Sequence, residues 1–284
     1  MENYSLAERL GYKRNDRLLI IHADDVGISH SANRATIEAF EAGIVTCGSI
    51  MVPCPWFPEI AAYCREHPEV DLGIHLTTTS EWEYYRWGPV ASRDRVASLL
   101  DEEGFLWRTR EQMVQHARLE EVEIELRAQI ERALEFGVKP THLDPHMHIA
   151  FGNLKTFELY CHLGREYNIP PVLAKSTPEI EAVQQLSLPI IDWGIDGLTL
   201  GTGETLAEKK ASYYDALSGL KPGVTELRLH LGMDDDEMSA IMGNHHMLRY
   251  YDYRVFTDPE TKRLIGKLQI KLIGWKHIAV LMKV

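Results

Sequence analysis

The sequence predicts an α/β protein built as a (β/α) barrel, TIM-like in either a regular or a distorted form. Its 284 residues are close to the roughly 250 that an eight-fold barrel needs. Short apolar runs alternate with segments of helical spacing, and this order indicates βαβ units and a parallel sheet. The chain has no linker rich in Pro, Gly and Ser and no low-complexity tract, so we expect residues 1–284 to form a single domain.

Four strands and three helices are expected in the first half of the chain. The apolar run at 18–23 is typical of a buried strand, and the helix over 31–42 ends at Gly43. The long helix over 111–136 is amphipathic and ends at Gly137. The remaining elements of this half are strands at 47–52 and 71–76, a helix over 58–67, and a strand that begins at 142–143.

The second half continues the alternation. The segment 224–231 alternates with period two and is the clearest strand, and the acidic run at 234–237 is typical of a helix N-terminus. The other expected elements are helices over 157–167 and 206–220, extended segments at 171–174 and 188–192, and a last strand at 268–273. The total is seven or eight strands. Because a barrel binds its ligands at the carboxyl ends of its strands, polar residues there are the candidates for chemistry.

Composition and charge argue against several classes of function. Hydrophobic residues make up 45% of the chain and charged residues 25%, as is ordinary for a soluble globular protein. The net charge of −12 disfavours nucleic acid and anionic membranes as partners, since basic residues supply most of the affinity for phosphates. No signal-peptide run and no 18-residue apolar stretch is present, so we predict a cytoplasmic protein without a membrane partner.

The cysteines and the common nucleotide or nucleophile motifs give no alternative chemistry. The four cysteines lack C-x-x-C spacing, so a thiolate zinc site or a redox motif is not expected. We predict unpaired, buried or half-buried thiols of a reducing compartment at Cys47, Cys54, Cys64 and Cys161. The sequence also contains no Gly-rich phosphate loop and no G-x-S-x-G motif.

Ionisable side chains end three of the expected strands. The first strand ends in Asp24 and Asp25, the third in His75, and the fourth opens into the segment 142–148. A carboxylate and imidazoles that converge at one barrel mouth can bind a divalent cation of the zinc or late-transition type. Adjacent aspartates point to opposite faces of a regular strand, so both reach the mouth only if the chain turns, as Gly27 would allow.

The segment 142–148 has an ionisable group at every second position. His142, Asp144, His146 and His148 share one face if the backbone is extended, although Pro145 is expected to break a regular strand there. A single histidine is usually a hydrogen-bonded core or surface residue. Four ionisable groups in seven residues instead favour a metal or catalytic role for at least one of them.

His230 ends the strand at 224–231. Glu226, Arg228 and His230 alternate with three leucines, so these polar side chains would face the barrel interior. A histidine at this strand end can act as a general acid near neutral pH. The alternative is an edge strand with one face in water.

Candidates for substrate binding come mainly from outside the strands. Trp82 and Trp87 belong to an aromatic stretch that follows His75, and such rings stack on sugars as readily as they pack a loop onto the barrel. Arg249 lies in a polar segment that is otherwise typical of a surface. The candidate substrate-binding residues are Trp82, Trp87, Asp144, His148 and Arg249.

Several of these motifs together resemble one known family. The sequence is similar to the YdjC-like (ChbG-type) carbohydrate deacetylases, which are related to the wider polysaccharide-deacetylase group. The resemblance covers roughly residues 17–275 and rests on motifs that are specific in combination. They are LLIIHADDVG at 18–27, GIVT at 43–46, GIHL at 73–76, LDEEGF at 100–105, PTHLDPH at 140–146, GVTEL at 223–227, and His230.

The resemblance implies a barrel, and it implies roles for five residues of the matching motifs. Asp24 corresponds to the general base, and Asp25, His75 and His146 to the ligands of one divalent metal ion. Family likeness suggests Mg²⁺ as the ion, whereas the two imidazoles suit Zn²⁺ or another transition metal at least as well. His230 corresponds to the histidine of a His-Pro-Gly motif, but this chain has leucine in place of the proline, which affects the loop that places the acid.

The function implied is removal of the acetyl group from an N-acetylated amino sugar or oligosaccharide. The metal would polarise the acetyl carbonyl and a water, Asp24 would take the proton of the water, and His230 would protonate the leaving amine. A small-molecule sugar is thus the expected partner, and a homodimer is left open.

Two other functions agree with the same residues. The metal site can serve an amidase or esterase acting on another substrate, whereas phosphate chemistry is disfavoured because no Lys or Arg neighbours the ligands in sequence. A protein of another class, an inactive sugar-binding regulator, would keep the pocket without turnover. Asp24 favours the enzyme, since a binding protein does not need it, and the altered loop after His230 favours the regulator.

Overall fold

A curled parallel sheet forms the centre of the computed structural model, which describes residues 4–148, 150–151, 153–200 and 205–283. Strand β1 (Arg17–Val26) is central, and each of its residues after Arg17 is buried, as expected of a parallel strand covered on both faces. The sheet order is β4-β3-β2-β1-β6-β5, with β7 paired to β1. The other strands are β2 (Cys47–Ile50), β3 (Leu72–Leu76), β4 (Leu143–Pro145), β5 (Trp193–Asp196), β6 (Gly223–His230) and β7 (Lys271–Leu272).

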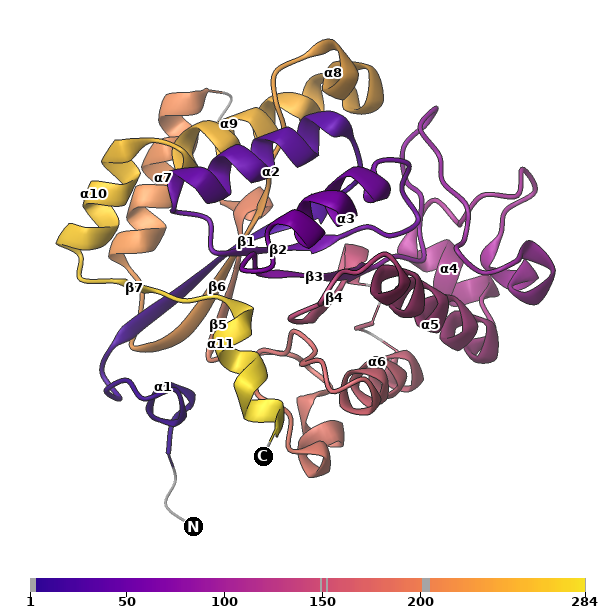
Figure 1. The fold of residues 1–284 in the computed structure, drawn as a ribbon, viewed down its shortest axis with the longest axis horizontal. Coiled ribbons are helices and arrows are strands. Elements are labelled where there is room, and N and C mark those ends of the chain that lie inside the picture. Colours follow the sequence, from indigo (N-terminus) through magenta and orange to yellow (C-terminus); the bar gives the residue numbers. More distant parts are fainter. Residues whose placement is uncertain (1–3, 149, 152, 201–204, 284) are drawn as a thin grey trace.

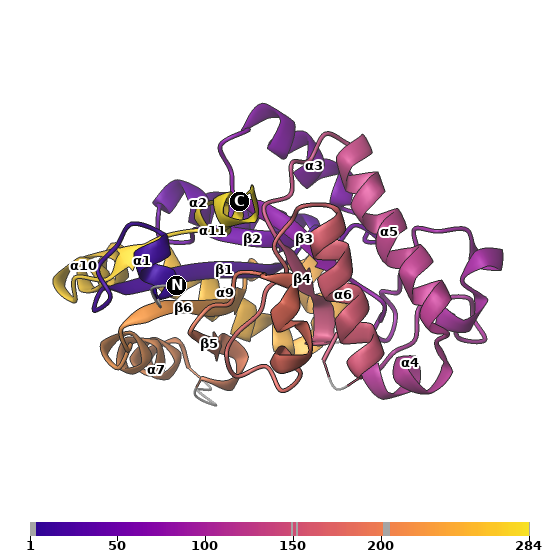
Figure 2. The ribbon, with the colours of Figure 1, turned by 90° about the horizontal axis from the view of Figure 1, so that it is seen from below.

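Helices surround this sheet (Figures 1 and 2). Helix α2 packs on β1, α5 on β3 and α9 on β6, while α6 lies beside α5 and α7 beside α9. The longer helices are α2 (His30–Ala42), α3 (Phe57–Glu66), α5 (Leu119–Glu135), α6 (Leu154–Glu166), α7 (Leu206–Ser218), α9 (His246–Phe256) and α10 (Pro259–Lys267). The shorter ones are α1 (Leu6–Arg9), α4 (Arg110–His116), α8 (Asp236–Met242) and α11 (Trp275–Ala279).

Along β1, the residues on one face change from apolar to polar. Leu18 and Ile20 belong to a small apolar cluster with residues of α1 and α11, which lie near the start of the strand. His22 and Asp24 follow at the next positions of the same period-two face. The amino end of the sheet is therefore closed by apolar packing, and ionisable groups gather at its carboxyl end.

The predicted barrel is confirmed as a parallel α/β domain, but its regular sheet is not fully closed. Between β4 and β5 the connection consists of isolated bridges, Leu143 to Pro171 and Ala174 to Ile191. The extended segments expected at 171–174 and 188–192 are thus not regular strands. Proline lacks the N–H that a ladder requires, and the first of these segments follows Pro170 and begins with another proline.

Other predicted elements are shifted or divided. The single helix expected over 111–136 is two helices, α4 and α5, because Ala117 is extended and the Arg118 N–H is bound by the Ser98 hydroxyl. Strand β5 begins after the segment predicted for it, and the last strand is reduced to two residues. The helix predicted from the acidic run at 234–237 is confirmed as α8, which Asp235 caps.

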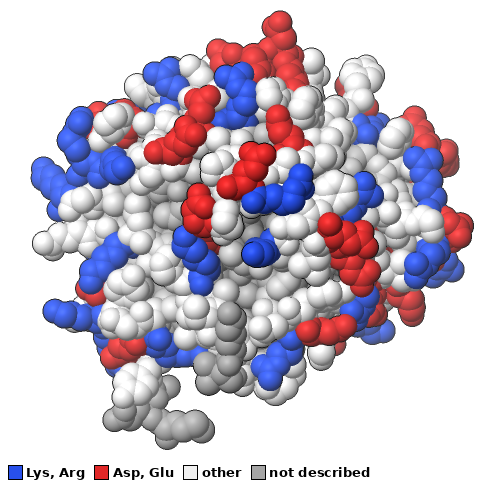
Figure 3. Space-filling view, in the orientation of Figure 1, with Lys and Arg blue, Asp and Glu red and all other residues white. Residues whose placement is uncertain are grey.

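The surface of the structure carries charges of both signs, and its cysteines agree with what the sequence predicts. On the face shown in Figure 3, basic and acidic side chains are interspersed. Within the described part of the chain, no helix is both long and apolar enough to cross a membrane. All four cysteines are free, and Cys64 alone among them is not fully buried.

Candidate metal centre and catalytic cavity

A cavity of about 380 Å³ opens at the carboxyl ends of the strands. Strands β1, β3, β4 and β6 all contribute residues to it, which is the position expected for a site in this class of fold. The lining residues are Asp24, Asp25, His75, Glu81, Trp82, Asp144, Pro145, His146, Met147, His148, Asp196, Leu198, Arg228, His230, His245, Leu248 and Arg249. All five predicted metal and catalytic residues are among them.

A backbone distortion at the end of β1 brings both aspartates to the cavity. Asp25 has a positive φ of 60°, and the register between β1 and β2 shifts between Ala23 and Val26. Gly27 follows with a φ of 90°. The left-handed residue breaks the alternation of side chains, so Asp24 and Asp25 line the same cavity. This confirms the turn that the sequence requires, and such strained residues are typical of functional sites.

Three atoms that can act as metal ligands lie close together beside this turn. The Asp25 Oδ1 lies 3.2 Å from the His75 Nε2 and 3.2 Å from the His146 Nδ1, and all three side chains are buried. Although it is buried, Asp25 Oδ1 has no hydrogen-bond partner among the described residues, so the two imidazoles approach it without the alignment of a hydrogen bond. A carboxylate oxygen and two ring nitrogens around one point can hold a metal ion, and these residue types fit one of the zinc class.

Each imidazole is held from its far side by a carboxylate. The His75 Nδ1 lies 2.6 Å from Asp144 Oδ2 and 2.9 Å from the hydroxyl of Ser49. The His146 Nε2 lies 3.2 Å from Glu81 Oε2. Outer carboxylates of this kind fix the tautomer and the orientation of histidine ligands. Asp144, predicted as a substrate contact, is thus placed to orient His75.

Arg249 approaches the same carboxylate from helix α9. Its guanidinium lies 2.5 Å from Asp25 Oδ2, and its side chain is buried rather than at the surface. Burial alone would raise the pKa of Asp25, but Arg249 and the two imidazoles outweigh it and hold that pKa well below its usual range. Arg228 also lines the cavity, so two basic side chains lie near the predicted ligands in space, although none neighbours them in sequence.

Asp24 and His230 lie side by side at the carboxyl ends of the paired strands β1 and β6. The His230 Nε2 lies 3.9 Å from Asp24 Oδ2 and 4.0 Å from Asp25 Oδ2. The alternation predicted for β6 is confirmed, because Leu227 and Leu229 are buried in the main core while His230 lines the cavity. Burial lowers the pKa of His230, and its Nδ1 has no hydrogen bond within the described part of the chain.

The predicted substrate contacts divide into two groups. Trp82 and His148 line the cavity, and the buried indole N–H of Trp82 has no partner among the described residues. Trp87 is not a lining residue, since it is buried behind the wall and its indole N–H donates to the carbonyl of Thr79 at 2.9 Å. We therefore assign no substrate contact to Trp87.

The period-two face predicted for 142–148 is wrong beyond Pro145. The strand ends there, and Met147 and His148 have positive φ values of 51° and 54°. His142 is not a cavity residue, because it is fully buried and its Nε2 lies 2.7 Å from the Nε2 of His22. Only three of the four ionisable groups in this segment therefore reach the cavity.

One wall of the cavity is formed by the long segment after β3. Its backbone is fastened to α5, where the Glu125 carboxylate accepts N–H bonds from Val90 and Ala91, each at 2.9 Å. The Gln129 side chain accepts from the N–H of Thr77 at the start of the segment. Burial raises the pKa of Glu125 to about 7. These contacts fix the segment that carries Glu81 and Trp82.

Glu81 gives a first testable consequence. Replacing it by alanine should weaken metal binding by about 10- to 100-fold, since His146 loses its outer partner, whereas Glu81→Gln keeps an acceptor and should lose less. Competition with a chromophoric chelator measures this. Glu83→Ala, an exposed acidic residue two positions away, is the matched control. An unchanged affinity in Glu81→Ala would remove Glu81 from the site.

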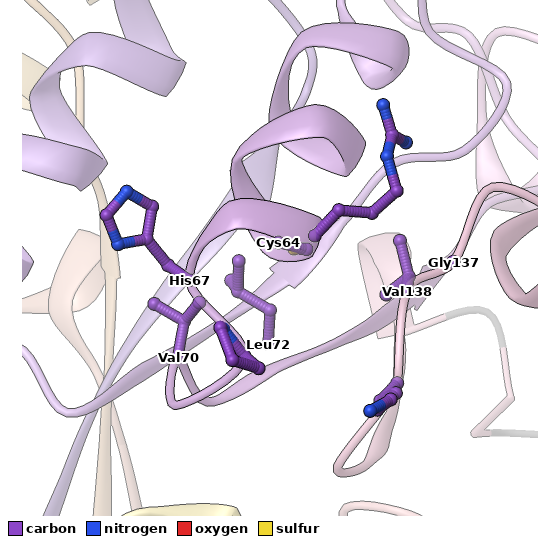
Figure 4. Close-up of a pocket in the computed structure, with 9 residues that line it drawn as sticks. Cys64, His67, Val70, Leu72, Gly137 and Val138 are labelled. Carbon is purple, nitrogen blue, oxygen red and sulfur yellow. The ribbon is translucent and has the colours of Figure 1, made fainter.

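A second hollow lies elsewhere, beside the end of α3 and the start of β3 (Figure 4). Its volume is about 150 Å³, and its lining includes Cys64, His67 and Lys139 but no carboxylate. Burial raises the pKa of the Cys64 thiol to about 12, so this thiol is a poor nucleophile. This second hollow therefore lacks the carboxylates that line the first cavity.

Comparison with known proteins finds relatives over most of the chain. A family model described as YdjC-like protein matches residues 18–267, a range that contains every predicted metal and catalytic residue. A carbohydrate deacetylase of Clostridium beijerinckii is 36% identical over 260 residues, which covers 92% of this chain and 99% of that protein. One of Thermus thermophilus is 31% identical over 273 residues, covering 92% and 94%. A solved structure from Enterococcus faecalis, described as a candidate cellobiose-phosphate cleavage protein, has a TM-score of 0.77 at 26% identity and covers 92% and 98%.

Proposed function

This chain belongs to the YdjC-like family, and from that premise we propose that it is a metal-dependent carbohydrate deacetylase. It removes the acetyl group from an N-acetylated amino sugar or oligosaccharide. The observation that carries the proposal is the buried Asp25 Oδ1, which makes no hydrogen bond among the described residues and lies 3.2 Å from one nitrogen of each of two imidazoles. Asp24 and His230 lie beside this group in the same cavity.

Asp25, His75 and His146 would hold one divalent cation. Bound there, the cation would supply Lewis-acid chemistry by polarising the acetyl carbonyl and increasing the acidity of a water molecule. Two ring nitrogens and one carboxylate oxygen suit zinc or another late transition metal better than magnesium, which prefers oxygen ligands. Arg249 would hold the second oxygen of Asp25, so that Oδ1 faces the two imidazoles.

Asp24 is placed to act as the general base, and His230 as the general acid. Their facing atoms, Oδ2 and Nε2, are 3.9 Å apart, so a reacting centre beside them can reach both. Asp24 would accept the proton of the attacking water. His230 would donate a proton to the leaving nitrogen, and the burial that lowers its pKa makes its charged form a stronger acid.

The cavity suits a sugar ring with an acetamido group. Its volume of about 380 Å³ lies within the range of roughly 300–1,000 Å³ common for small-molecule sites. Trp82 offers an aromatic ring and a buried, unpaired N–H, while His148 and Asp196 offer polar groups at the wall. An aromatic ring beside polar side chains suits a sugar, which has apolar ring faces and polar hydroxyl groups.

His230→Ala should lower kcat by about 10²- to 10⁴-fold, the size of an acid–base contribution. Metal content should stay unchanged, because the ring is outside the proposed ligand set. Steady-state kinetics and elemental analysis of the same preparation measure both quantities. His162→Ala, which removes an exposed histidine of α6, controls for the substitution itself. A His230→Ala enzyme with wild-type kcat would contradict the acid role.

One observation favours the second candidate, an inactive sugar-binding regulator. His230 is followed by Leu231 and Gly232, without the proline expected from the family motif. Acetate and free amine released from a panel of N-acetylated and O-acetylated mono- and oligosaccharides distinguish the deacetylase from the regulator and from an esterase. Equal amounts of acetate and amine support the deacetylase. Release from O-acetyl esters alone supports an esterase, and saturable sugar binding without acetate supports the regulator.

A further inference from the structure

Behind Asp24, a continuous chain of hydrogen bonds runs through the interior of the sheet. The Asp24 Oδ1 lies 2.6 Å from the Nδ1 of His22, and the Nε2 of His22 lies 2.7 Å from the Nε2 of His142. Both rings are completely buried, and the His142 ring also stacks against Trp275 of α11 at a centroid distance of 5.4 Å. Neither histidine lines the catalytic cavity.

The chain continues from His142 to the opposite end of the sheet. The His142 Nδ1 lies 2.9 Å from the Thr141 hydroxyl, which donates to Asp71 Oδ1 at 2.5 Å. The other oxygen of Asp71 accepts the backbone N–H of Lys276 at 2.9 Å. Asp71 itself is buried and lies just before β3. Burial raises the pKa of Asp71, but each of its two oxygens accepts a hydrogen bond, one from Thr141 and one from the Lys276 backbone, so its carboxylate fixes this end of the chain as an acceptor.

Because Asp71 accepts at the end of this chain of hydrogen bonds, the positions of the other protons can be worked out in order. Thr141 has one hydroxyl proton and gives it to Asp71, so its oxygen accepts from the Nδ1–H of His142. A neutral His142 with its proton on Nδ1 can only accept at Nε2, so His22 donates there through its own Nε2–H. A proton must then lie between His22 Nδ1 and Asp24 Oδ1, because two acceptors do not approach to 2.6 Å without one.

The charges of the buried groups agree with this order. Burial by itself lowers the pKa of His22, but Asp24, Glu226 and Asp144 together outweigh burial and raise that pKa to about 9, which favours the imidazolium. Burial, followed by the charge of His22, lowers the pKa of His142 well below its usual range, which favours the neutral ring. These directions agree with the proton order given by the hydrogen bonds, in which a charged ring adjoins Asp24 and a neutral ring lies beyond it.

We propose that His22 is a positioning residue for Asp24. The proton order from Asp71 through Thr141 and His142 determines that His22 carries the proton that holds Asp24. His22 holds Oδ1 of Asp24 with a proton on Nδ1, so only Oδ2 is free to accept the proton of the attacking water. That oxygen is also the one that faces His230. The inference rests on the proposed function, since it assigns a partner to the general base.

A second metal ion is the competing explanation for this cluster. His22, Asp24 and Asp144 offer three ligand atoms that lie within 4.8 Å of one another. Against it, Asp144 is bound by His75 and Ser49, and both nitrogens of His22 have close partners. Elemental analysis of the wild-type protein separates the two explanations, since a second ion that is lost in His22 variants would overturn the positioning role.

The kinetic test uses two substitutions of His22, each of which keeps a hydrogen-bonding group at the position of one ring nitrogen. In His22→Asn the side-chain amide lies where Nδ1 was, and in His22→Gln it lies where Nε2 was. His22→Gln should therefore lose kcat by about 10- to 100-fold, the effect typical of removing an orienting partner, and His22→Asn should lose less than about 10-fold. KM and metal content should not change in either. His30→Gln, which breaks a 2.8 Å imidazole–carboxylate pair with Glu59 outside the cavity, should leave kcat unchanged.

Equal losses in the two His22 variants, or none in either, would overturn the proposal. A measurement that needs no activity completes the test, even if these variants fold poorly or the wild type releases no acetate. Nitrogen-15 NMR of histidine-labelled wild-type protein should show His142 protonated on Nδ1 alone and His22 protonated on Nε2. A His142 ring protonated on Nε2 would overturn the proton order, whereas an inactive wild type with the expected order would refute the proposed function alone.

Discussion

Replacing either His75 or His146 by alanine should remove the bound metal ion and reduce acetate release to background. Each ring supplies one of the three buried metal-ligand atoms, so its removal leaves only two ligand atoms and an empty space where the ring was. The rate should fall by at least the roughly 10²- to 10³-fold that one group stabilising an oxyanion contributes. Metal per chain, acetate release and the melting temperature should be measured together.

The matched control for these variants is His67→Ala. His67 pairs with Glu69 at the surface and lies outside the catalytic cavity, so this variant should keep both metal and activity. Stoichiometric metal in His75→Ala or His146→Ala would remove that residue from the ligand set. A large loss of melting temperature without loss of metal would assign the ring a packing role instead.

The second large effect separates the two adjacent aspartates. Asp24→Asn should keep the metal but lower kcat by about 10²- to 10⁴-fold, because an amide cannot accept the proton of the water. Asp25→Asn should instead lose metal affinity, since Asp25 Oδ1 lies between the two imidazoles and Asp24 does not. Metal titration and single-substrate kinetics of both variants measure the difference. If the two variants behave alike, the division of roles between them is wrong.

Much of the fold follows from patterns that the sequence displays directly. The apolar run of β1 and the strict alternation of β6 each predict a strand, and the structure pairs these two strands over Arg17 to Asp24. Strand β5 was misplaced because two of its four residues are exposed, the other two are only partly buried, and the four lack an apolar period. The incomplete closure beside it depends on prolines and single bridges, which leave no periodic signal.

The candidate site was predictable where it lies on strand ends. Asp24, Asp25, His75, His146 and His230 end or follow strands of a parallel sheet, and such ends meet at one edge. This rule needs only the strand assignments, which were correct for β1, β3 and β6.

Other functional positions gave no comparable signal. Arg249 lies on α9, a helix that the sequence did not predict, and Glu81 lies in an irregular segment whose path is fixed by contacts to α5. His22 alternates with Asp24 on β1, so its proximity could have been inferred from period two. Its pairing with His142, 120 positions away, depends on the packing of β1 against the rest of the sheet and is visible only in the structure.

The most direct test of the account is acetate release by the wild-type protein before and after its metal is removed and restored. The substrate is the N-acetylated sugar that is turned over fastest, and the ions returned are zinc, another late transition metal and magnesium, each at one equivalent per chain. We expect that a chelator abolishes acetate release and that zinc or the other transition metal restores it, whereas no ion restores the activity of His146→Ala. Full activity after the chelator has removed all metal would contradict the proposed function.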